Sequence, residues 1–148
     1  INKKLFKKHF HVLVNSDNYK QVGFLKYLGA FAAENKGKDV LETLNYAGQL
    51  LDNPENLVLV FPQGKLFSNH VNSINFEKGV MQMINASQKR LSIVFAATFI
   101  DYFSKRKPSA FSYLQNWESE EYISLQLLKS AYNKHYDHAV VKQTQISE

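Results

Sequence analysis

Five stretches of the chain are rich in apolar and β-branched residues and predict β-strands. They lie at residues 9–14, 30–33, 57–61, 91–99 and 110–114. Short apolar runs bounded by polar residues, glycine or proline are typical of strands. The third and fourth runs are apolar almost without interruption, which is typical of strands that are buried on both faces of a sheet.

Apolar residues spaced three or four apart predict helices between these strands. The first helix begins at Ser16 or Asp17, which can cap it, and ends at Gly29, because glycine commonly terminates helices. The second begins at Asp39, which forms a capping-box pattern with Glu42 three residues later. Both helices fall between predicted strands, as expected for alternating elements.

Two more helices are predicted in the second half of the chain. One covers residues 76–84, and the other runs from residue 119 to about residue 135. In the last helix the spacing predicts three inward-facing residues: Ile123, Leu127 and Ala131. The tail from Val140 has little pattern.

The alternation of strands and helices predicts the fold class. It indicates an α/β fold with a mostly parallel central sheet flanked by helices. A chain of 148 residues is one domain's worth, so we expect residues 1–148 to form a single domain. In such folds ligands bind beyond the carboxyl ends of the strands, and the loop after Phe61 is at such an end.

The composition limits which cellular compartment and which binding partners fit this chain. The chain has no cysteine, which removes disulfides and thiol chemistry and fits a reducing compartment such as the cytoplasm. The net charge is +5, with 18 Lys plus Arg against 13 Asp plus Glu. Only Arg90 and Arg106 are arginines, so the basic excess suits an anionic membrane surface or acidic small molecules at least as well as nucleic acid. No apolar stretch is long enough to span a membrane.

The segment after the third strand carries the clearest candidate chemistry. The strand is broken by Pro62, and Gly64 then allows a tight turn or the close approach of a ligand. Lys65 and Ser68 follow and can supply a positive charge and a hydroxyl group. The alternative interpretation is an ordinary turn at the end of a strand.

This segment resembles the FPEGTRS block of the glycerol-phosphate and lysophosphatidic acid acyltransferases. Phe61, Pro62, Gly64 and Ser68 match the block if one extra residue precedes the serine. At the remaining positions this chain has other residues, namely Gln63 for the glutamate, Lys65 for the threonine and Leu66 for the arginine. In the family the block helps to bind the phosphorylated acceptor, so the resemblance implies that residues 61–65 and Ser68 bind substrate.

Three further blocks follow the order of the family. The Tyr27-Leu28-Gly29-Ala30-Phe31 segment resembles a glycine-hydrophobic block that precedes a basic acceptor-binding residue, and here Lys36 or Lys38 could serve. Leu44-Asn45-Tyr46-Ala47 resembles the helix before the FPEG strand, and Phe76-Glu77-Lys78-Gly79 resembles the helix start after it. The resemblance covers about residues 10–114.

The resemblance implies an enzyme of phospholipid biosynthesis. Such an acyltransferase moves a fatty acyl group from a coenzyme A or acyl-carrier-protein thioester to a hydroxyl of a lysophospholipid or related lipid. The resemblance implies no bound cofactor, a location in the cytoplasm at the membrane periphery, and a lipid acceptor and an acyl thioester as partners.

The family's catalytic N-H-x-x-x-x-D block is not found in this chain. His11 and Asp17 are one residue too far apart, and His70 is followed by Asn75 where the aspartate would stand. Two explanations remain. Because the chain begins with Ile1 rather than methionine, the block can lie upstream, in which case residues 1–148 alone are expected to be inactive. Otherwise the chain is a non-catalytic relative that binds lipids or a partner.

The histidines offer a weaker signal. His9 and His11 alternate on a strand and share a face, but no cysteine or nearby carboxylate completes a metal site, so we expect no metal. We expect them to be ordinary strand residues with satisfied hydrogen bonds. His135 and His138 have no sequence partners and are expected to face solvent.

Two lysine clusters, at residues 3–8 and 105–107, have aromatic neighbours. They are either solvated surface or sites of attraction to anionic lipid headgroups, which is worth about 1 kcal/mol for each basic residue near the membrane. In the second case the neighbouring rings of Phe6, Tyr102 and Phe103 could enter the interface. A nucleic-acid partner is not expected, because arginine is scarce and no glycine-aromatic RNA motif is present.

Overall fold

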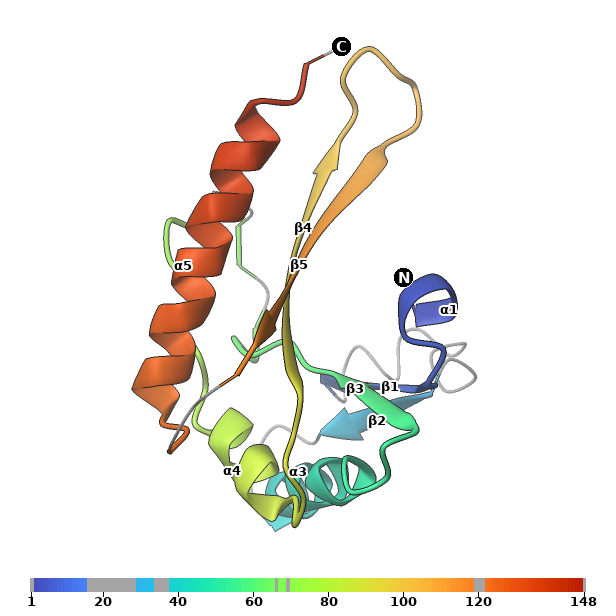
Figure 1. The fold of residues 1–148 in the computed structure, drawn as a ribbon, viewed down its shortest axis with the longest axis vertical. Coiled ribbons are helices and arrows are strands. Elements are labelled where there is room, and N and C mark those ends of the chain that lie inside the picture. Colours follow the sequence, from blue (N-terminus) through green and yellow to red (C-terminus); the bar gives the residue numbers. More distant parts are fainter. Residues whose placement is uncertain are drawn as a thin grey trace. The chain divides into compact units, whose positions relative to one another are not determined.

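The computed structural model describes residues 2–15, 29–33, 38–65, 67–68, 70–118 and 122–147. These residues form a mixed α/β protein with a small parallel three-stranded sheet flanked by helices (Figure 1). The chain divides into two compact units. Unit 1 comprises Ile1–His70 and Asn75–Leu91, and unit 2 comprises Val71–Ile74 and Ser92–Glu148. The single domain expected for residues 1–148 stays a prediction.

The sheet of unit 1 has three parallel strands in the order β2-β1-β3. β1 (His9–Asn15) is central and pairs with β2 (Ala30–Ala33) on one side and with β3 (Asn56–Leu59) on the other. The strands predicted at residues 9–14 and 30–33 are therefore confirmed. In this register Leu13 lies beside Phe31 and His11 beside Val58, so these side chains share one face of the sheet.

Two helices pack around that face and build the core of unit 1. They are α3 (Lys38–Leu50) and α4 (Gly79–Ala86), and a short helix α1 (Asn2–Leu5) precedes the sheet. Leu44 and Ala47 of α3 and Met83 of α4 are buried together. The strands contribute half-buried residues to the same cluster, namely Leu13, Phe31, Val58 and the following Val60.

Several expectations for unit 1 are corrected. Residues 57–61 are not buried on both faces, because β3 is an outer strand of the described sheet; its residues are half-buried and Phe61 is 63% exposed. Asp39 lies inside the first turn of α3 rather than capping it, where its charge still favours the helix dipole. α4 begins at Gly79 instead of residue 76. The helix predicted at residues 17–28 lies outside the described residues.

Unit 2 is built from an antiparallel hairpin and one long helix. β4 (Ile93–Asp101) pairs with β5 (Ser109–Trp117) in a separate two-stranded sheet. Figure 1 shows α5 (Leu125–Thr144) running along this hairpin. Residues 91–99 were expected to form a strand buried on both faces, and this is wrong. Phe95 and Ala97 are buried, whereas Ala96 and Thr98 are exposed, because α5 covers only one face of the hairpin.

The last helix also differs from the prediction. It begins at Leu125, where the hydroxyl of Ser124 accepts a hydrogen bond from the Leu127 amide at 3.1 Å, and it continues through residues that were expected to lack structure. Leu127 was expected to face inward but is 45% exposed, whereas Leu128, His135 and Ala139 are buried. The buried face of α5 includes polar and aromatic residues, so apolar spacing alone placed it wrongly. None of the described helices has the length and apolar content needed to cross a membrane.

Candidate functional site

The Phe61-Pro62-Gln63-Gly64 segment forms a tight turn directly after β3. The Gly64 amide donates a hydrogen bond to the Phe61 carbonyl at 3.2 Å, which closes the turn. Proline fixes its own φ and favours the second position of such turns. Gly64 has φ +64°, a left-handed conformation that glycine adopts without strain. Because β3 is parallel to β1, the turn lies beyond the carboxyl end of a parallel strand, as expected from the sequence.

This turn is joined to the segment that precedes α4. The Glu77 amide donates a hydrogen bond to the Pro62 carbonyl at 2.8 Å. A Cβ atom added at Gly64 would lie 3.1 Å from Cγ of Glu77, so the turn rests against that side chain. Two of the segments on which the family resemblance is based are therefore in direct contact.

The third segment of the resemblance, at residues 44–47, lies in α3 and packs against α4. Leu44 and Ala47 of that segment are buried against Met83 of α4, and the side-chain Nε2 of Gln82 donates to Asn45 Oδ1 at 2.8 Å. The ends of the two helices are also linked, because the Asp52 carboxylate accepts hydrogen bonds from the Ser87 hydroxyl and the Gln88 amide, both at 2.8 Å. These hydrogen bonds lower the pKa of Asp52 below its usual value, and the bond from Ser87 has the larger effect. The pairing of α3 with α4 thus fixes the residues that contact the turn.

The side chains around the turn combine charge, hydroxyl and aromatic groups. Lys65, Phe67 and Ser68 are exposed, and Phe61 is largely exposed. The Ser68 hydroxyl accepts a hydrogen bond from the His70 amide at 3.2 Å. A cation beside exposed rings can bind the anionic headgroup and the hydrocarbon part of one lipid molecule. The Glu77 carboxylate is also exposed and adds an acidic group beside the turn.

The other predicted binding residues do not all join this turn. Gly29 immediately precedes β2 and has φ +77°, and a Cβ atom there would lie 2.1 Å from the Phe10 carbonyl oxygen, so only glycine fits beside β1. Lys38 is exposed at the first position of α3, and within the described ranges no hydrogen bond or ion pair joins it to the turn. Lys36 and Leu66 lie outside the described residues.

The histidines of the described chain form no catalytic pair of the family's kind. His9 is exposed on β1 and His11 is half-buried beside Val58. Within the part of the chain that the structure describes, no histidine is hydrogen-bonded to a carboxylate, and no group of three or more His, Asp or Glu side chains could hold a metal ion.

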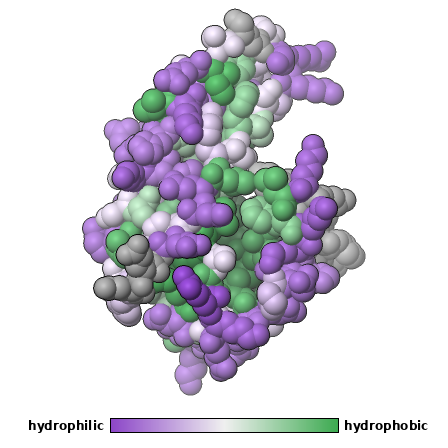
Figure 2. Space-filling model, viewed as in Figure 1, coloured by the Kyte–Doolittle hydropathy of each residue, from purple (hydrophilic) through white to green (hydrophobic). Residues whose placement is uncertain are grey.

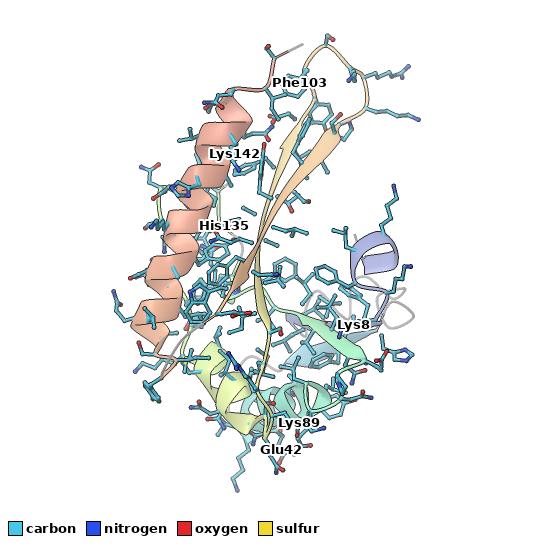
Figure 3. The ribbon with its side chains drawn as sticks, viewed as in Figure 1. Lys8, Glu42, Lys89, Phe103, His135 and Lys142 are labelled. Atoms are coloured by element: carbon cyan, nitrogen blue, oxygen red, sulfur yellow. The ribbon has the colours of Figure 1, made fainter. Side chains whose placement is uncertain are left out.

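His135 was expected to face solvent, and this is wrong. It is buried in unit 2, where it points from α5 toward the hairpin (Figure 3). Its Nε2 lies 3.2 Å from the Tyr113 carbonyl oxygen, and its Nδ1 lies 3.0 Å from Gln115 Oε1. Burial lowers the pKa of His135, reinforced by the charges of His138 and Lys142, while the Tyr113 hydrogen bond opposes the shift. Both neighbouring oxygens are hydrogen-bond acceptors, and the neutral ring has a single N–H to donate to one of them.

Sequence reasoning also missed Asn133, the residue that attaches residues 71–74 to α5. Its side-chain oxygen accepts from the Ile74 amide at 2.7 Å, and its Nδ2 donates to the Ile74 carbonyl at 2.9 Å. The Tyr136 hydroxyl donates to the Val71 carbonyl at 3.3 Å. The sequence did contain a signal for the burial of His135, because Leu128, His135 and Ala139 are spaced by seven and four residues, as on one helix face.

Comparisons with known proteins add no relative: no family model, no curated protein and no solved structure matches this chain.

Proposed function

We propose that the turn at residues 61–64, with Lys65 and Ser68, is the acceptor-binding site of an acyltransferase of the glycerophospholipid type. The observation that carries the proposal is the hydrogen bond from the Glu77 amide to the Pro62 carbonyl. It joins two segments that resemble consecutive blocks of that family, and a third such segment packs below them in α3. The proposed fold is correspondingly that of this acyltransferase family.

Each group near the turn has a role in the proposal. The Lys65 ammonium attracts the charged headgroup of a lysophospholipid and so takes the role of the family's arginine, whose own position is occupied by Leu66 in this chain. The exposed rings of Phe61 and Phe67 offer apolar surface to the hydrocarbon part of the acceptor or the acyl donor. Ser68 supplies a hydroxyl group that can donate to a phosphate oxygen.

The reaction of the proposal is acyl transfer to a hydroxyl group. A histidine base removes the proton of the acceptor hydroxyl, whose oxygen attacks the carbonyl carbon of the thioester. The carbon–sulfur bond breaks, the thiolate leaves and takes up a proton, and an ester is formed. The resemblance assigns the base to an N-H-x-x-x-x-D block, which residues 1–148 do not contain, so in this proposal the residues at the turn bind and orient the acceptor.

The test is steady-state acyl transfer by the protein that carries this block, with Gly64→Leu compared with Gly64→Asn. A left-handed backbone costs leucine about 1–2 kcal/mol, whereas asparagine tolerates it. We expect Gly64→Leu to lower kcat/KM for the lysophospholipid by about tenfold and to leave the KM for the thioester unchanged. Gly64→Asn should retain most of the activity. Equal kinetics for both variants and the parent would contradict the site.

A non-catalytic lipid-binding relative is the second candidate. It is favoured by the lack of any histidine hydrogen-bonded to a carboxylate among the described residues. Saturable lysophospholipid binding that Gly64→Leu weakens, in a full-length protein that transfers no acyl group from either thioester, would identify this case.

A further inference from the structure

The end of the β4–β5 hairpin exposes aromatic and cationic side chains together. We call residues 100–109, which connect and flank the two strands, the hairpin tip. Ile100 is 63% exposed, Tyr102 57% and Phe103 40%. The next residues, Lys105, Arg106 and Lys107, are exposed as well. Large apolar side chains that are exposed together mark a candidate interaction surface.

A turn hydrogen bond and an aromatic contact fix the conformation of the hairpin tip. The Lys105 amide donates to the Tyr102 carbonyl at 2.9 Å and closes a turn. Phe103 has φ +46°, a left-handed conformation that is unfavourable for a residue with a Cβ atom. Its ring packs edge-on against Phe111 of β5, with ring centroids 6.0 Å apart. Phe111 of β5 therefore holds the ring of Phe103 in place.

The hairpin tip carries a net positive charge. Residues 100–109 contain three cations and one carboxylate, Asp101, which gives a net charge of +2. Asp101 is half-buried and accepts a hydrogen bond from the Gln143 side chain of α5. Figure 3 shows Lys142 of α5 at the same end of unit 2 as Phe103. In Figure 2, hydrophilic side chains project from this end beside hydrophobic ones.

This combination fits an anionic lipid bilayer better than other polyanions. Tyrosine and phenylalanine are well suited to the boundary between headgroups and hydrocarbon, and lysine and arginine are attracted to anionic headgroups. A single-stranded nucleic acid would need a groove that tracks its backbone and rings on which bases stack in succession. An acidic protein would match the cations without using the exposed side chains of Tyr102 and Ile100.

We propose that the hairpin tip is a docking site for an anionic membrane surface. Tyr102 and Phe103 enter the headgroup region, while Lys105, Arg106 and Lys107 lie against the lipid phosphates. The site consists of residues of unit 2 and shares none with the turn of unit 1. Membrane docking at the hairpin tip can therefore be tested independently of acyl transfer.

The test is co-sedimentation of the whole chain with vesicles of phosphatidylcholine alone or with added phosphatidylglycerol. The triple variant Lys105→Gln, Arg106→Gln, Lys107→Gln is compared with Lys89→Gln, Arg90→Gln, Lys134→Gln, which removes the same charges from exposed positions elsewhere. We expect the first triple to weaken partitioning onto the anionic vesicles by at least about tenfold, and the control triple by less than about threefold. Equal losses, or equal binding to neutral vesicles, would overturn the proposal.

A second pair of variants tests insertion. Tyr102→Ser leaves the contact between Phe103 and Phe111 in place and should weaken partitioning by about threefold or more. Tyr102→Trp adds a fluorescent reporter, and brominated lipids should quench it beyond the quenching of Trp117 in the parent chain. No added quenching of vesicle-bound protein would overturn the proposal. The proposal would also be overturned if duplex DNA displaced the parent and Tyr102→Ser from the vesicles equally well.

Discussion

Unit 1 and unit 2 are stabilised by different kinds of contact. In unit 1 a parallel sheet packs against α3 and α4, and the candidate turn is fixed by backbone hydrogen bonds such as that from Glu77 to Pro62. In unit 2 a hairpin lies against one helix, with Phe95 packed among Trp117, Tyr132 and His135. The position of the candidate turn in unit 1 therefore depends on backbone hydrogen bonds. The packing of unit 2 depends on side-chain hydrogen bonds and on contacts between aromatic rings.

The largest expected effect is on the close packing of unit 1. A Cβ atom at Gly48 would lie 2.5 Å from the Met83 carbonyl oxygen and 2.6 Å from Ala86 Cβ. Gly48→Val should therefore lower the free energy of unfolding by about 3 kcal/mol, because overpacking against backbone forces the helices apart. Urea denaturation followed by circular dichroism measures this. The exposed neighbour provides the control: Gln49→Val should cost less than about 1 kcal/mol. Similar midpoints for the two variants would contradict the α3–α4 packing.

A smaller effect is expected for the polar attachment in unit 2. Asn133→Ala removes both hydrogen bonds to Ile74 and leaves its buried backbone groups unpaired, which should cost about 2 kcal/mol. Faster hydrogen exchange of the Ile74 amide is the specific readout. Lys134→Ala, at the exposed next position, should change neither quantity. Unchanged exchange at Ile74 in Asn133→Ala would show that the attachment does not depend on this side chain.

The smallest effect concerns pH and tests whether His135 is a buried neutral residue. Burial lowers the pKa of His135 in the folded protein below the ordinary 6.5, so below that pH the unfolded chain binds more protons than the folded one. The contribution of this residue is therefore complete above about pH 6.5 and declines as the pH falls below it. The urea midpoint of the parent should fall more steeply on acidification than that of His135→Gln. His138→Gln, exposed on the same helix, should keep the steeper dependence; parallel curves for the parent and His135→Gln would contradict a buried neutral ring.

Much of unit 1 could be predicted from sequence because its signals are local. The apolar runs of β1 and β2, the spacing in α3, and the proline and glycine of the turn each act within a few residues. The exposure of Phe61 could not be predicted in this way. An apolar run looks the same in a central strand and in an outer strand, and the position of β3 is decided by pairing with distant residues.

Unit 2 was predicted less well because its determinants are not local. The run at residues 91–99 indicated a strand, but its antiparallel partner is set by the hairpin that follows. The buried face of α5 contains His135, Tyr132 and Asn133, and their partners lie on β4, β5 and residues 71–74. From sequence alone, polar residues of this kind are expected on the surface, because their hydrogen-bond partners are not known.

The contact between the turn and Glu77 in unit 1 could not be predicted from sequence either, because it joins two segments through main-chain atoms.

The most direct test of the central proposal is an amide NMR titration of the isotope-labelled chain with short-chain lysophosphatidic acid below its micelle concentration. We expect saturable shifts of the amide signals at residues 61–65 and 76–79. They should be weakened by Gly64→Leu and retained in Gly64→Asn and in the distant Lys89→Gln. Shifts confined to the hairpin tip, or shifts at the turn that Gly64→Leu leaves unchanged, would contradict an acceptor site at Phe61-Pro62-Gln63-Gly64.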